Sequence, residues 1–151
     1  MATNVAKSAE PDLSGLAAHL RLVITRTARR LRQQAGTDLG PSQISALASI
    51  ERHGPLTPSE LAEIERIQRP SATRIVARLE EADLVERVAD PADRRSFTVG
   101  INADGRALMN KLRTRKNAYL AKRLRELDEA DLATLDRAAE ILEDLLEGER
   151  R

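Results

Sequence analysis

The tetrapeptide Thr57-Pro58-Ser59-Glu60 constrains the fold more than any other feature of the sequence. Threonine at the N-cap, proline at the first helical position and glutamate at the third form a capping box, which satisfies the free amides at the start of a helix. A short helix therefore begins here and ends near Glu65, a few residues before the next start at Arg69-Pro70. The sequence predicts two short helices joined by a tight turn. The apolar side chains expected to point inward from the first are Leu61, Ala62 and Ile64.

The second of these helices has one apolar and one basic side. Ala72, Ile75, Val76 and Leu79 follow the i, i+3, i+4, i+7 spacing of a buried stripe. Residues 66–79 contain four arginines and no acidic residue. The opposite side is thus small and positively charged, and it consists of Arg69, Ser71, Thr73, Arg74, Ala77 and Arg78.

Two segments with strand-like alternation follow, at 84–88 and 97–101, with a turn-rich charged segment between them. They predict a β-hairpin. Two short helices joined by a tight turn, the second basic and followed by a hairpin, are typical of a winged helix-turn-helix. The expected fold class is therefore mainly α with a small β-hairpin wing.

Helices are also predicted before and after this unit, which brings the expected total to six. Residues 41–101 form the expected DNA-binding lobe, residues 12–36 and 102–148 a helical dimerisation region, and residues 1–11 a disordered tail. The apolar stripes of the terminal helices are too long for a small lobe to cover, so a second copy of the chain is the economical cover. We expect a homodimer with dimerisation helices from both termini.

The composition excludes several classes of protein. The absence of cysteine removes disulfides, thiolate catalysis and thiol redox sensing. The two histidines, His19 and His53, lack metal-ligand spacing, so we expect no bound metal and no cofactor. No nucleophile paired with a base is found, so we do not expect the protein to be an enzyme. Without an apolar run of membrane length or a signal segment, the expected location is the cytoplasm, with no membrane partner.

Duplex DNA is the expected partner, because the only aromatic residues, Phe97 and Tyr119, are too few for the stacking that single strands and RNA require. A helix in the major groove needs short side chains near its backbone and long donors at its tips. Arginines on the hairpin turn suit the minor groove, and Asp93 is expected to hold a neighbouring arginine through a charge-assisted hydrogen bond. The predicted DNA-binding residues are Ser59, Arg69, Pro70, Ser71, Thr73, Arg74, Arg78, Arg94 and Arg95.

A different class of function stays open at this point. Arginines on one helix face can also dock an acidic protein, so the alternative is a winged-helix protein-interaction module.

A family pattern is found, in order and spacing, in residues 57–62 (TPSELA), 69–80 (RPSATRIVARLE), 84–87 (LVER) and 90–95 (DPADRR), and in Gly105. In these residues the sequence resembles the MarR family of winged helix-turn-helix transcriptional regulators. The resemblance implies a homodimer that binds a pseudo-palindromic operator, usually as a repressor released by a small anionic or phenolic effector. By this likeness Arg95 is the minor-groove residue, and the effector pocket of the family directs attention to His19 and Arg26.

Two positions depart from the family pattern. By the family pattern the helix that begins at Arg69 is the recognition helix. Asp83 stands where the family usually has glycine between this helix and the wing, and Asn102 replaces the usual threonine before the long helix. We expect the first to affect the turn and the second to keep a capping oxygen.

Overall fold

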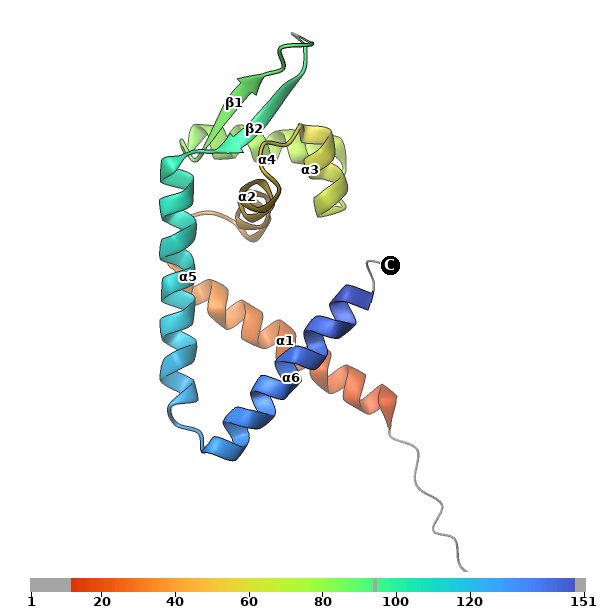
Figure 1. Ribbon diagram of the computed structural model, residues 1–151, viewed down its shortest axis with the longest axis vertical. Coiled ribbons are helices and arrows are strands. Elements are labelled where there is room, and N and C mark those ends of the chain that lie inside the picture. Colours follow the sequence, from red (N-terminus) through yellow and green to blue (C-terminus); the bar gives the residue numbers. More distant parts are fainter. Residues whose placement is uncertain (1–11, 94, 149–151) are drawn as a thin grey trace, which may run out of the picture.

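The structure is a computed structural model that describes residues 12–93 and 95–148. The predicted tail at 1–11 lies outside these residues. Within them the chain forms six helices and one hairpin, as predicted (Figure 1). The elements are α1 (Leu13–Ala35), α2 (Pro41–His53), α3 (Pro58–Glu65), α4 (Arg69–Glu81), β1 (Val85–Ala89), β2 (Phe97–Ile101), α5 (Ala103–Leu124) and α6 (Glu129–Gly148).

The lobe consists of α2, α3, α4 and the hairpin, packed on one apolar core. Its fully buried side chains come from every one of these helices and from β2. This shared core packs α4 together with the base of the wing. β1 and β2 pair antiparallel, with Val85 opposite Ile101. Leu56 adds a bridge to Val99, with hydrogen bonds of 3.0 and 2.7 Å, and so attaches the segment before α3 to the hairpin.

Ile64 does not occupy the inward position that the sequence predicts. Leu61 and Ala62 are buried, but Ile64 is 40% exposed. An eight-residue helix buries little more than one narrow face, and Ile64 lies on the edge of that face, beside a hollow between α2 and α3. The prediction of an inward Ile64 was therefore wrong.

The junction between the recognition helix and α5 uses both departures from the family pattern. Asp83 adopts φ +57°, the left-handed conformation that glycine favours, so the chain turns here despite the substitution. Asn102 caps α5, because its Oδ1 accepts a hydrogen bond from the Gly105 amide at 2.8 Å. The same side chain donates from Nδ2 to the carbonyl of Asp83 at 2.8 Å, which ties the two positions together.

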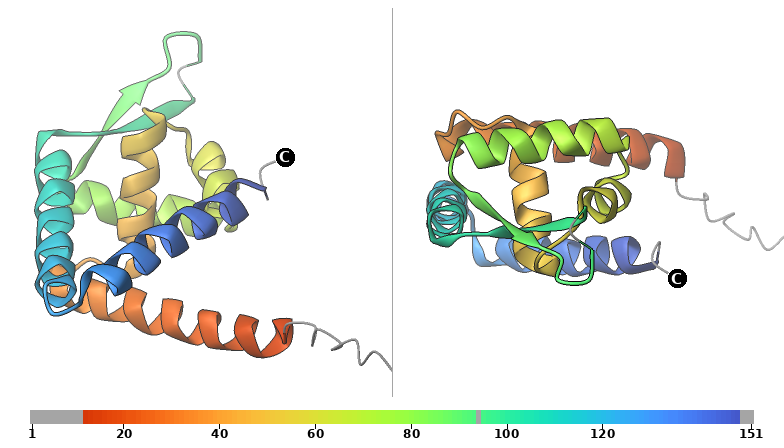
Figure 2. Two further views of the ribbon diagram at one scale, coloured as in Figure 1. Left: turned by 60° about the horizontal axis from the view of Figure 1, so that its bottom comes forward. Right: turned by 90° about the horizontal axis from the view of Figure 1, so that it is seen from above.

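The terminal helices extend away from the lobe. α5 runs from the hairpin past α2 to the far end of the molecule, while α1 and α6 lie on opposite sides of it when viewed from above (Figure 2, right). Arg115 of α5 donates to the carbonyls of Ala35 and Gly36 at 2.9 and 3.2 Å, which fixes the end of α1. No residue of α6 is buried, and Leu13 of α1 and Leu145 of α6 are 69% and 62% exposed.

An ion pair holds α5 against α2. Arg113 donates two hydrogen bonds to Glu51, of 2.7 and 2.9 Å, and the side chains are 49% and 23% exposed. The hydrogen bond from Arg113 lowers the pKa of Glu51 below its ordinary value of 4.5. The pair is partly solvated, so its contribution to stability is small.

We predict a matching pH dependence. A carboxylate with a lowered pKa stabilises the folded state fully above its unfolded pKa, and that contribution is lost as the pH falls below about 4.5 and through the folded value. Glu51→Gln should therefore destabilise the protein by up to about 1 kcal/mol at pH 7, and the difference from the parent should shrink near pH 4. Urea denaturation at both pH values measures this. The control is Glu63→Gln, at an exposed position of α3; a Glu51→Gln difference that stays constant with pH would contradict the assignment.

Candidate nucleic-acid interface

The outward face of α4 carries the predicted recognition residues. Ala72, Val76 and Leu79 are buried and fix the rotation of the helix, so that Arg74 and Arg78 are exposed. Thr73, Pro70 and Arg69 are also exposed, and Ser71 is half-buried. The Thr73 hydroxyl donates to the carbonyl of Arg69 at 3.1 Å, and Arg74 Nη2 lies 3.5 Å from Ser71 Oγ. Thr73 and Arg74 thus lie close to the surface of the helix, and the exposed face of α4 is basic.

The guanidinium groups of α4 and of Arg95 have no carboxylate partner among the residues that the structure describes. Within residues 12–93 and 95–148, no ion pair within 4 Å involves Arg69, Arg74, Arg78 or Arg95. Their charge is therefore available to an external anion.

The wing tip is shaped by aspartate side chains. Asp93 Oδ1 accepts a hydrogen bond from the backbone amide of Arg95 at 2.9 Å, and Asp90 Oδ1 accepts one from the amide of Ala92 at 2.9 Å. Asp93 thus holds the main chain of Arg95 through an Asx turn. The sequence predicted a hydrogen bond to a neighbouring arginine without specifying which of its groups donates. Arg94 lies outside the described residues.

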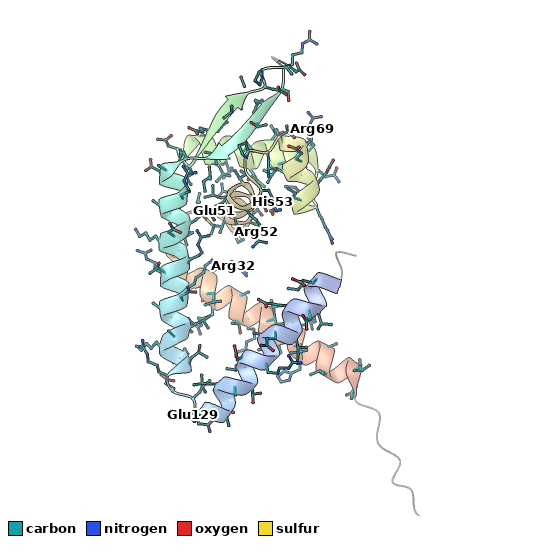
Figure 3. All side chains as sticks on the ribbon, viewed as in Figure 1. Arg32, Glu51, Arg52, His53, Arg69 and Glu129 are labelled. Carbon is teal, nitrogen blue, oxygen red and sulfur yellow. The ribbon has the colours of Figure 1, made fainter. Side chains whose placement is uncertain are left out.

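A hollow of about 290 Å³ brings several predicted residues together. It lies between the start of α3, the start of α4 and the wing, and Figure 3 shows Arg69 beneath the hairpin. The α3 side contributes the capping box, in which Thr57 Oγ1 accepts from the Glu60 amide at 3.2 Å and Glu60 accepts from the Thr57 amide at 2.8 Å. The backbone hydrogen bond from Thr57 lowers the pKa of Glu60. The predicted residues that line the hollow are Ser59, Arg69, Asp93 and Arg95.

Arg87 is a positioning residue that the sequence reasoning missed. It donates from Nε and Nη2 to Glu80 of α4 at 2.5 and 3.1 Å, and its guanidinium lies 3.9 Å from the ring centre of Phe97. The hydrogen bond to Glu80 raises the pKa of Arg87. This contact links the base of the wing to the recognition helix. Opposite charges seven residues apart, across a helix-to-strand turn, were the available signal.

The two residues predicted to bind an effector, His19 and Arg26, do not line a common hollow. Arg26 lines a hollow of about 590 Å³ between α1 and α5, together with Tyr119 and Arg123. His19 is exposed on α1 and lines none of the hollows described here. The effector role of both stays a prediction.

Two features are absent from the part of the chain that the structure describes. There, no three histidine, aspartate or glutamate side chains gather closely enough to hold a metal ion. None of the described helices has the length and apolar character needed to cross a bilayer.

A compact lobe with a helix-turn-helix, a basic second helix and an arginine-bearing hairpin beside it defines a winged helix-turn-helix DNA-binding protein. Comparison with known proteins narrows this class. The protein-family model that is described as the MarR family matches residues 39–97 of the sequence. The HTH-type transcriptional regulator Mb0904 of Mycobacterium bovis is 34% identical over 128 residues, which cover 84% of this chain and 90% of the relative. The chain belongs to the MarR family of transcriptional regulators.

Two further comparisons give a solved structure and a repressor that are similar to this chain. The crystal structure of a putative transcriptional regulator from Pseudomonas aeruginosa PA01 matches with a TM-score of 0.79 at 35% identity, over 88% of this chain and 95% of that one. The HTH-type transcriptional repressor MdtR of Bacillus subtilis is 29% identical over 92 residues, 61% of this chain and 59% of the relative. Regulators of this family bind DNA and function as dimers, which favours DNA over the acidic protein partner that the sequence left open.

Proposed function

We propose that the chain binds an inverted-repeat operator as a homodimer and represses transcription, with release by a small anionic or phenolic ligand. In this proposal α4 enters the major groove, where Arg74 and Arg78 read bases and Ser71 and Thr73 help to set the register. Ser59 and Arg69 contact the phosphate backbone, and Arg95 enters the minor groove. Asp93 supports the wing turn.

One observation carries the proposal: the first arginine of α4 and the wing arginine open onto the same side of the lobe. Arg69 and Arg95 line one hollow, although 26 positions separate them in the sequence. A groove of DNA has to meet the helix and the hairpin together, and this arrangement allows it. The exposed apolar residues of α1 and α6 support a second subunit.

Two further observations support repression and ligand release. MdtR, the similar protein from Bacillus subtilis, is named a repressor. The hollow that contains Arg26 offers guanidinium groups and the Tyr119 ring to an anionic aromatic molecule.

Footprinting of the DNA upstream of the gene tests the proposal. A two-fold dimer should protect an inverted repeat whose half-sites lie about 34 Å, or one DNA turn, apart. Binding should weaken steeply with salt, because phosphate contacts release counterions. Addition of salicylate, a phenolic acid, should release the DNA. Protection of a single half-site would argue against the dimer, and an unchanged footprint in salicylate and related phenolic acids would leave a repressor without this ligand control.

A further inference from the structure

Two helices of the dimerisation half carry opposite charges. α1 contains five arginines and no carboxylate, whereas α6 contains seven carboxylates and one arginine. Neither excess is needed by the lobe, because both helices lie outside it (Figure 1). The near-zero net charge of the chain, +1, conceals this separation.

Each excess is concentrated on one face of its helix. Arg26, Arg29 and Arg30 follow helical spacing and line the hollow of about 590 Å³ with Arg123 of α5; we call these four residues the arginine hollow. On α6, carboxylates recur at steps of four, three and four residues, which places them on a single face. We call this set the acidic stripe, and it consists of Asp136, Glu140, Glu143 and Glu147.

Contacts within the chain leave most of this charge unmatched. In residues 12–93 and 95–148, the only ion pair formed by α6 is the local one between Arg137 and Glu140, at 2.7 Å. Arg123 lies 3.9 Å from Glu126, in the loop before α6, and no ion pair in the same ranges joins α1 to α6. Within one subunit, the arginine hollow and the acidic stripe therefore form no ion pair with each other.

The arrangement of the helices places the missing partner in a second copy. Viewed from above, α1 lies on one side of α5 and α6 on the other (Figure 2, right). A two-fold rotation about an axis parallel to α5 exchanges the two sides, so it brings the partner's α6 to the side of α1. Resting on the proposed homodimer, we propose that the acidic stripe of each subunit pairs with the arginine hollow of the other.

This pairing has a structural logic beyond affinity. The apolar side chains of α1 and α6 supply a non-directional attraction, which does not by itself select one alignment of the helices. Complementary charges fix register and speed the encounter. The dimer should therefore form through charge-directed contact of α6 with α1 and α5.

Reversed charges test the pairing. One variant carries Arg26→Glu, Arg29→Glu and Arg30→Glu, and the other carries Asp136→Lys, Glu143→Lys and Glu147→Lys. Each alone should raise the dimer dissociation constant by at least about tenfold, because like charges then face each other in both symmetric contacts. An equimolar mixture should form the heterodimer in preference to either homodimer. Native mass spectrometry and sedimentation equilibrium measure these populations.

The mixture separates pairing between subunits from pairing within one. In the heterodimer both contacts between subunits are again matched, whereas within each chain α1 and α6 keep the same sign. Arg21→Glu, on another face of α1, is the matched control and should leave the dissociation constant within about twofold. Circular dichroism checks that the helices of all variants remain folded.

The outcomes also distinguish this pairing from the homodimer itself. A parent chain that sediments as a monomer would overturn the proposed function. A parent dimer whose stability ignores both reversals, or a mixture without preference for the heterodimer, would overturn the pairing alone. An unchanged dimer in an arginine variant that no longer binds salicylate would show that these arginines serve the ligand alone and would overturn the pairing.

Discussion

Replacing Gly105 by alanine should destabilise the protein by about 3 kcal/mol, although alanine is the better helix former by about 1 kcal/mol. A Cβ atom at this position would lie 2.2 Å from the carbonyl oxygen of Leu84 and 2.7 Å from Cγ1 of Ile101. The first is a main-chain atom at the start of the wing, so the first turn of α5 would have to move away from the hairpin. Urea denaturation measures the change in the free energy of unfolding.

Gly148 provides the matched control. It is the last residue of α6, and a Cβ there meets no heavy atom of the described residues within 4 Å. Gly148→Ala should therefore leave stability unchanged or raise it by less than about 1 kcal/mol. Equal stability of the Gly105→Ala variant and its parent would show that α5 does not approach the hairpin this closely.

Replacing Arg74 by alanine should weaken operator binding by about 1–3 kcal/mol, which is roughly 5- to 150-fold. Arg74 is exposed at the middle of α4, where a major-groove helix contacts base edges, and guanidinium reads guanine through two hydrogen bonds. The loss should be larger on the cognate site than on random duplex, so base preference should relax. Fluorescence anisotropy with both duplexes at one salt concentration measures the two affinities.

Arg52→Ala removes the same charge from the same lobe and serves as the control. Arg52 lies at the end of α2, on the side of the lobe away from the wing (Figure 3). Its loss should change both affinities only slightly and to the same extent. If Arg74→Ala weakened cognate and random DNA equally, Arg74 would be a phosphate contact and the base-reading role would have to move to another residue.

Much of the fold was predictable because it is specified by local signals. The capping box at Thr57 determines the start of α3, and the apolar spacing from Ala72 to Leu79 determines the buried face of α4. The outward direction of Arg74 and Arg78 follows from that spacing alone. The order of these elements, with the hairpin after them, was enough to predict the winged helix-turn-helix.

The remaining features depend on contacts between segments that are distant in the chain. The bridge from Leu56 to Val99 and the ion pair between Glu51 and Arg113 join residues more than 40 positions apart, and neither has a local pattern. Ile64 misled the reasoning because helical spacing does not say how wide a face the neighbouring helices cover. The sequence predicted that Asp93 holds a neighbouring arginine, but neither the residue nor the atom was specified, since backbone amides and side chains compete for the same oxygen.

The continuity of α5 has a mechanical consequence. Its 22 residues form a rod of about 33 Å. Asn102 connects one end of this rod to the segment before the hairpin, and Arg115 binds it to the end of α1. A tilt of about 5° at the distal end displaces the lobe by about 3 Å, a large part of the spacing between neighbouring base pairs. In a dimer, the distance between the two DNA-binding lobes therefore depends on small rotations at the far ends of the two α5 helices.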